Sequence, residues 1–137
     1  MALLFSQVVN APELVTLKFR FQSNGGQPNA ADFLVPGNCG VTSVTQAATD
    51  GIWTITFTEK WPVFVGGHGH VMPATNANDQ IVKIDVADYS ATAGTLIVHT
   101  IGALDTTQVA EAVAANDWVY LELTFCRRSG LAPTVAI

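Results

Sequence analysis

The segment with the clearest potential for metal chemistry is a glycine-rich stretch in which one residue separates His68 from His70. On a strand the two imidazoles point to the same face, because side chains alternate between faces. Neighbouring imidazoles can bind zinc or copper, and His99, in a later alternating segment, could supply a third ligand. A structural zinc site needs four ligands, however, and no cysteine lies close in sequence.

The favoured alternative is structural. Glycines around the histidines permit a bend or bulge at a point where the backbone comes close to another part of the molecule. The histidines are then exposed or hydrogen-bonded side chains. We therefore expect no bound metal and no other cofactor.

Catalytic constellations are not indicated elsewhere in the chain. Most aspartates lie in turn-like stretches, where the carboxylate usually hydrogen-bonds its own backbone. No segment resembles a nucleophile elbow, and Cys126 alternates with Thr124 in a strand pattern. The paired glycines Gly25–Gly26 and Gly66–Gly67 are turn glycines, because no strand-to-helix junction surrounds them. We expect a protein that is not an enzyme.

The composition argues for a protein-binding surface. The chain has 137 residues, of which 49% are hydrophobic and 12% are charged. Globular proteins average about 25% charged residues, so part of this surface is expected to be covered by partners. The net charge is −5, and the six basic residues are scattered apart from Arg127 and Arg128. Nucleic-acid binding is not expected, because it requires a basic cluster.

The cysteines and the apolar segments indicate a cytoplasmic site of synthesis and folding. Cys39 and Cys126 are interpreted as two free thiols, although a single disulfide is the alternative. The apolar first residues lack the basic region of a signal peptide. No apolar run approaches the roughly 20 residues of a membrane helix, so no membrane association is expected.

Apolar and polar residues alternate along several short segments, as is typical of half-buried antiparallel strands. In the first such segment Phe19 and Phe21 share a face, and Lys18 and Arg20 share the other. Strands are predicted over Leu14–Gln22, Val41–Gln46 (the weakest pattern), Ile52–Thr58, Val63–Val65 continuing through His70–Met72, Gln80–Val86, Thr95–Ile101 and Trp118–Cys126. Thr106–Ala115 is predicted to be a short helix or a loop with one helical turn.

Short strands at this spacing, separated by turn residues, indicate a sandwich or a barrel. The prediction is all-β: one domain over residues 1–137, an antiparallel jelly-roll-like β-sandwich of about eight strands with at most one short helix. Residues 1–12 and 129–137 are predicted to be short arms. For the first arm an edge strand is favoured, whereas for the second an edge strand and a docking arm remain equally open.

The apolar residues that the strand pattern does not account for are candidates for an interface. Trp118 and Tyr120 give bulk to the second face of a strand whose first face is already apolar, so that face is either buried or an interface. The candidate interface residues are Leu4, Phe5, Trp61, Trp118, Tyr120, Leu131, Val135 and Ile137.

Two blocks of the chain resemble small virion proteins of tailed bacteriophages. The first is Gly51–Phe57 (GIWTITF) followed by Trp61-Pro62, and the second runs from Ile84 to Arg128. The likeness covers roughly residues 41–129, and it departs from the pattern at Trp53, which is often tyrosine. The resemblance implies a capsid decoration (cement) protein or a head or tail accessory protein with a jelly-roll-like or related sandwich fold. It transfers no functional residue.

The functional expectation is therefore a non-enzymatic virion structural protein, favoured as a decoration protein that binds the outer capsid surface and stabilises the particle. It would bind the major capsid protein or other virion proteins as a homo-oligomer, with a trimer favoured. After folding in the host bacterial cytoplasm it would be located in the virion. The alternatives are a receptor- or glycan-binding knob of a fibre or spike, using Trp61 as a stacking platform, and a head–tail, neck or tail adaptor.

Overall fold

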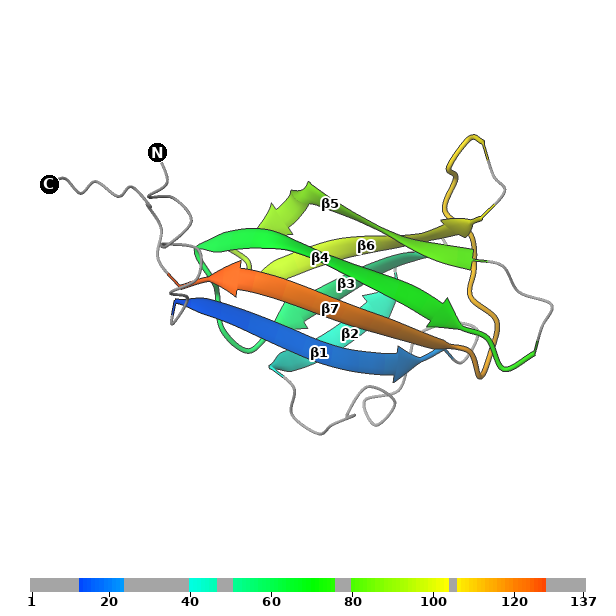
Figure 1. Cartoon of the computed structure of the whole chain (residues 1–137), viewed down its shortest axis with the longest axis horizontal. Helices are drawn as coiled ribbons and strands as arrows, with labels where there is room; N and C mark the ends of the chain where they lie inside the picture. Colours follow the sequence, from blue (N-terminus) through cyan, green and yellow to red (C-terminus); the bar gives the residue numbers. More distant parts are fainter. Residues whose placement is uncertain (1–12, 24–39, 47–50, 76–79, 104–105, 128–137) are drawn as a thin grey trace, which may run out of the picture.

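The computed structural model describes residues 13–23, 40–46, 51–75, 80–103 and 106–127. These residues form seven antiparallel strands, so the all-β prediction is confirmed (Figure 1). The strands are β1 (Leu14–Gln22), β2 (Val41–Gln46), β3 (Ile52–Phe57), β4 (Val63–Met72), β5 (Gln80–Ser90), β6 (Thr95–Gly102) and β7 (Trp118–Cys126).

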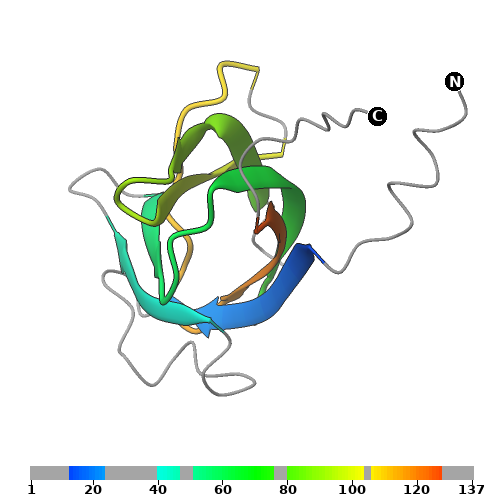
Figure 2. The same ribbon diagram turned by 90° about the vertical axis from the view of Figure 1, so that its left-hand side faces the viewer.

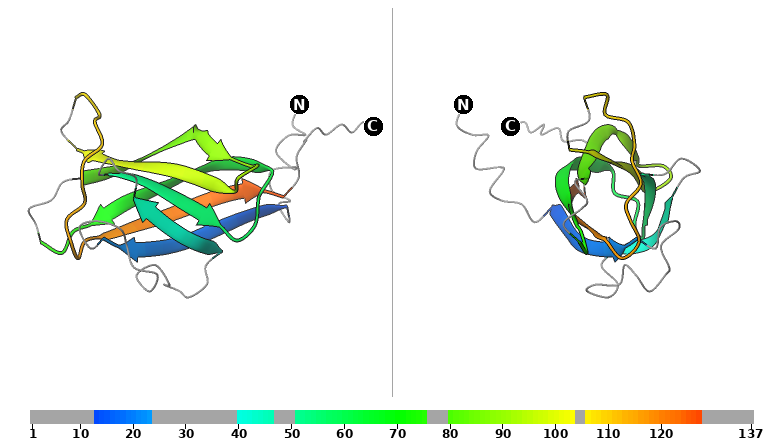
Figure 3. Two further views of the ribbon diagram at one scale, coloured as in Figure 1. Left: turned by 180° about the vertical axis from the view of Figure 1, so that it is seen from behind. Right: turned by 90° about the vertical axis from the view of Figure 1, so that its right-hand side faces the viewer.

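All seven strands belong to one sheet, in the order β1-β7-β4-β5-β6-β3-β2. Viewed from either end, the sheet curls until its edge strands β1 and β2 approach each other (Figures 2 and 3). The described strands therefore form one nearly closed sheet, which is closer to the barrel alternative than to the expected sandwich, and the jelly-roll detail is not confirmed. Strand twist and the register shifts in β2, β4 and β5 account for this curvature.

The alternating pattern places one face of each strand inside the curled sheet. In β7, Val119, Leu121, Leu123 and Phe125 are fully buried, while the intervening residues are half-exposed. The core also contains buried side chains from the other strands, including Phe19, Phe21, Val44, Trp53, Ile55, Phe57, Phe64, Leu96 and Val98. Burial of these apolar side chains is the main source of stability of the fold.

Trp61 belongs to this core, which corrects its assignment as an exposed interface residue. It is 8% exposed, and its ring stacks on Phe125 at a centroid distance of 6.1 Å. The Tyr89 hydroxyl donates a hydrogen bond to the Trp61 carbonyl at 2.6 Å, and burial raises the pKa of Tyr89. Trp61 lies in the connection between β3 and β4, outside any alternating segment, so local pattern did not predict its burial.

The opposite end of the sheet is closed by an extended segment that was predicted to be a short helix or a helical turn. Residues 106–115 contain no helix, and Ala110 forms an isolated bridge with Ile101. The Glu111 amide donates to the Thr100 carbonyl at 2.7 Å, and the Thr100 hydroxyl donates to the Glu111 carbonyl at 2.8 Å. Hydrogen bonds to β6 thus satisfy backbone groups of residues 106–115 that would hydrogen-bond within the segment if it were a helix.

Thr100→Val is expected to lower the free energy of unfolding by about 1–2 kcal/mol. Thr100 is fully buried, and its hydroxyl also accepts a hydrogen bond from the Trp53 indole at 3.3 Å. The valine leaves the Glu111 carbonyl and the Trp53 indole without this partner. Denaturant unfolding of this variant should be compared with that of Thr54→Val on the half-exposed face of β3. Equal stability of the two variants would contradict the proposed role of the hydroxyl.

Candidate functional site

The outward side chains of β1, β7 and β4 form a continuous surface, which we name the Trp118 face. The strand register places these side chains in rows across the three strands: Arg20 and His70 flank Tyr120, and Lys18 and His68 flank Glu122. The Trp118 face is defined as Lys18, Arg20, His68, His70, Trp118, Tyr120 and Glu122. Because β7 is paired along its full length on both sides, the rows are held on a rigid support.

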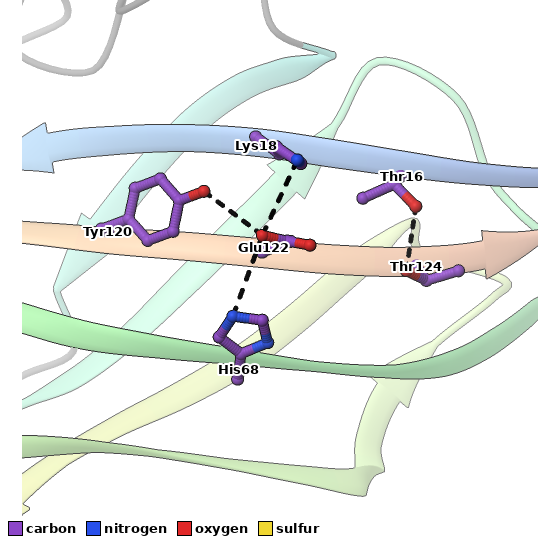
Figure 4. Close-up of polar contacts among 6 residues, drawn as sticks. All are labelled: Thr16, Lys18, His68, Tyr120, Glu122 and Thr124. Atoms are coloured by element: carbon purple, nitrogen blue, oxygen red, sulfur yellow. Dashed lines mark hydrogen bonds and ion pairs between the residues drawn. The ribbon is translucent and has the colours of Figure 1, made fainter.

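One half of the Trp118 face converges on a single carboxylate oxygen (Figure 4). Glu122 Oε2 lies 4.0 Å from Lys18 Nζ and 3.8 Å from His68 Nε2, and it accepts a hydrogen bond from the Tyr120 hydroxyl at 3.3 Å. The Lys18 and His68 side chains are 62% and 70% exposed, so solvent screens the Lys18–Glu122 ion pair and the His68–Glu122 contact. The contacts orient the carboxylate and contribute little to stability.

The other half of the Trp118 face combines aromatic rings with a cation. The Arg20 guanidinium lies 4.3 Å from the centre of the Trp118 ring, within the range of a cation–π contact. The His70 and Tyr120 rings are 5.1 Å apart at 37°. Arg20 Nε is buried without a hydrogen-bond partner among the described residues. This arrangement immobilises large amphipathic side chains before any partner arrives, which is favourable for binding.

The structure excludes one of the two interpretations of Trp118 and Tyr120. Both side chains lie on the outer face of β7 and are half-exposed, so their burial in a core is wrong. The interface interpretation remains a prediction. The sequence contained a signal for these two residues, because they are bulky residues on the polar side of a strand. It contained no such signal for Arg20, Glu122 or His70, which only the register brings beside them.

The three histidines do not form one site. His68 and His70 share the outer face of β4, as predicted, but His99 is on β6 with β5 between them. His99 Nδ1 instead lies 3.9 Å from Asp88 Oδ2. No group of three or more histidine, cysteine, aspartate or glutamate side chains suited to a metal occurs within the described ranges.

Steric requirements explain the glycines beside the histidines. The register of β4 against β7 shifts between Phe64 and Gly66, which is the predicted bulge. A Cβ atom on Gly67 would lie 2.6 Å from the Glu122 carbonyl oxygen, and one on Gly69 would lie 2.4 Å from the Tyr120 carbonyl oxygen. The interpretation of these glycines as a bulge and a close backbone approach is confirmed.

A groove between β4 and β5 was not predicted from the sequence. These two strands share one registered pair, His70 with Ile81, and an open groove of about 410 Å³ lies beside it. Its lining residues are Gly67, His68, Gly69, Ile81, Val82, Lys83, Ile84, Ile101 and Gln108. Lys83 Nζ donates to Gln108 Oε1 at 3.4 Å on its rim. The one available signal was the loss of alternation after Ile84, where Asp85 and Val86 are both exposed.

Several predicted site residues lie outside the described part of the chain. These are the two arms with Leu4, Phe5, Leu131, Val135 and Ile137, together with Cys39. Cys126 is half-buried and carries a free thiol among the described residues. The predicted roles of the arms therefore remain predictions.

The fold and the Trp118 face together define an antiparallel all-β domain with one nearly closed sheet and an aromatic–cationic outer surface. Comparison with known proteins adds no family to this class: no family model, no curated protein and no solved structure matches the chain. In the described residues, no helix has the length and apolar character required to cross a membrane.

Proposed function

We propose that this chain is a non-enzymatic structural protein of a bacteriophage particle that binds another virion protein through the Trp118 face. The observation that carries the proposal is the combination of Trp118, Tyr120 and Arg20 on a rigid outer sheet surface. Tryptophan, tyrosine and arginine are the residue types most enriched at the energetic centres of protein interfaces. The sequence resemblance over residues 41–129 supports the assignment to a virion.

The charge of the Trp118 face supports an acidic partner surface. With neutral histidines the face carries Lys18 and Arg20 against the single carboxylate of Glu122, whereas the whole chain has a net charge of −5. Complementary charge orients encounters and disfavours wrong partners. An acidic patch on the major capsid protein is the proposed partner, and several copies bound as a homo-oligomer would add avidity.

The double variant Arg20→Ala/Trp118→Ala is expected to bind particles at least about tenfold more weakly than the unaltered chain. The assay uses virions from the virus that encodes the chain, stripped of this protein and titrated with purified protein. Binding of the unaltered chain should also weaken at high ionic strength, because the proposed contact is partly electrostatic.

The matched control is Thr54→Ala/Thr56→Ala, which truncates half-exposed residues on the outer face of β3. Unchanged affinity of the Arg20→Ala/Trp118→Ala variant would contradict binding through the Trp118 face. Absence of the protein from purified virions would contradict the virion role itself. Imaging of the bound particle separates a decoration protein from the adaptor alternative, which would form a closed ring.

The glycan-binding alternative loses the feature on which it was based. It relied on the turns and on exposed aromatic residues such as Trp61, and Trp61 is 8% exposed within the core. Trp118 is covered on one side by the Arg20 guanidinium, which leaves less of its ring free to stack on a sugar. Protein binding is therefore the better supported function.

A further inference from the structure

The opening between β4 and β5 has a partly apolar lining, which includes Ile81, Val82, Ile84 and Ile101. Five large apolar side chains are exposed among the described residues: Leu14, Val65, Ile81, Val86 and Val109. Three of them, Val65, Ile81 and Val86, lie on the two strands that border the opening, with exposed fractions of 52%, 45% and 61%. Of these three, Ile81 lines the groove itself, beside the less exposed Val82 and Ile84. A contiguous apolar lining marks a binding surface, whereas scattered single residues do not.

The same opening leaves strand backbone without its usual partner. N-terminal of His70, the residues of β4 have no registered pair on β5. β5 also departs from β6, since it advances five residues from Ile84 to Tyr89 while β6 advances two from Val98 to Leu96. Figure 1 shows β5 bending sharply near its end. Unpaired strand backbone can hydrogen-bond an extended segment.

We propose that this opening receives an extended segment of a second copy of the chain, namely residues 129–137, which docks along the groove between β4 and β5. In this segment Leu131, Val135 and Ile137 occupy alternate positions, so an extended conformation places all three on one face. That face matches the apolar lining of the groove, formed by Ile81, Val82, Ile84 and Ile101. The groove volume of about 410 Å³ suits a short stretch of such a segment. The proposal does not depend on the virion role.

The position of the segment in the chain favours exchange between copies. β7 ends at Cys126, which pairs with Val63 at the beginning of β4, and the Arg127 amide that follows donates to the Glu13 carbonyl beside β1. Within one copy, β7 and β5 lie on opposite sides of β4 in the sheet. The chain's own segment would have to cross β4 to enter the opening, whereas a segment from a second copy approaches from outside.

The test uses full-length protein and a synthetic peptide of residues 129–137. The unaltered chain is expected to form oligomers whose fraction rises with concentration in sedimentation velocity. Val135→Asp/Ile137→Asp in the full chain should abolish them, because the charges prevent apolar docking. The peptide should then bind this monomeric variant and slow amide hydrogen exchange at residues 66–69 and 82–86.

Matched variants locate the binding site. In the Val135→Asp/Ile137→Asp background, Ile81→Lys/Ile84→Lys in the groove should weaken peptide binding at least about tenfold, while Leu14→Lys on β1 should leave it unchanged. Thermal unfolding verifies that the variants fold. Amide hydrogen exchange of the Val135→Asp/Ile137→Asp chain, whose groove is unaltered, measures peptide binding at the groove without any groove substitution. A peptide carrying Asp at both altered positions should not bind.

Three outcomes would overturn the proposal. Absence of exchange protection at the groove means that the segment does not bind there. A chain that remains monomeric at all concentrations while its groove is protected means that the occupant is its own segment. Equal binding of an unrelated apolar peptide means that the groove does not select this segment.

Discussion

Phe125→Ala is expected to lower the free energy of unfolding by about 3–5 kcal/mol. Phe125 is fully buried at the centre of an aromatic cluster. Its ring centroid lies 4.9 Å from that of Phe57, 5.3 Å from Phe64, 5.4 Å from Tyr89 and 6.1 Å from Trp61. Truncation removes contacts with all four rings and leaves a cavity that rigid neighbours fill poorly. Because small domains are stable by about 5–15 kcal/mol, this loss is a large part of the total.

Denaturant unfolding followed by tryptophan fluorescence measures this effect. Tyr120→Ala is the matched control, because Tyr120 is an aromatic residue on the same strand but on the half-exposed outer face. The control should lose far less stability than Phe125→Ala. Similar losses in the two variants would be incompatible with the assignment of the inner and outer faces of β7, and with it the location of the Trp118 face.

Gly67→Ala/Gly69→Ala is expected to lower the free energy of unfolding by about 2–5 kcal/mol. The added methyl groups would lie 2.7 Å from Leu123 Cδ2 and 2.6 Å from Leu121 Cδ2, in addition to the close contacts with backbone carbonyls. β4 would have to move away from β7. Because His68 and His70 share β4 with these glycines, the variant should also disturb the rows of the Trp118 face.

His68→Ala/His70→Ala is the control for the glycine variant. Both histidines are exposed on the outer face of β4, and replacements at such sites usually change stability by no more than about 0.5 kcal/mol. Thermal unfolding with and without a chelator compares the variants. If the histidine variant were the less stable one, and only in the absence of chelator, the steric account of this segment would have to be replaced by a metal site.

Both proposed interactions depend on which strands of the curled sheet are paired along their full length and which are not. β7 is paired on both sides along its full length, which makes the Trp118 face a rigid surface. β4 is fully paired with β7 but has one registered pair with β5, so the sheet is open at the next strand. Rigid aromatic anchors suit a preformed partner surface, whereas an opening with unpaired backbone suits an extended segment. The two surfaces therefore make distinct predictions.

The sequence by itself determined the strands, because alternation with period two is a local property. Leu14–Gln22, Val41–Gln46 and Trp118–Cys126 have the predicted bounds. β5 continues to Ser90 instead of ending at Val86, because its irregular pairing with β6 extends it beyond the local pattern. Local sequence also identified Trp118 and Tyr120 as candidate interface residues, because they are large side chains on the otherwise polar face of a strand.

The tertiary structure alone decided which strands became neighbours and therefore which side chains meet. Trp61 entered the core because the connection that carries it folds over one end of the sheet. His99 is separated from His68 and His70 because β5 lies between β4 and β6. Arg20 meets Trp118 through the pairing of strands that are distant in the chain. Periodicity specifies which side of a strand is buried, but pairing between distant segments depends on packing of the whole core.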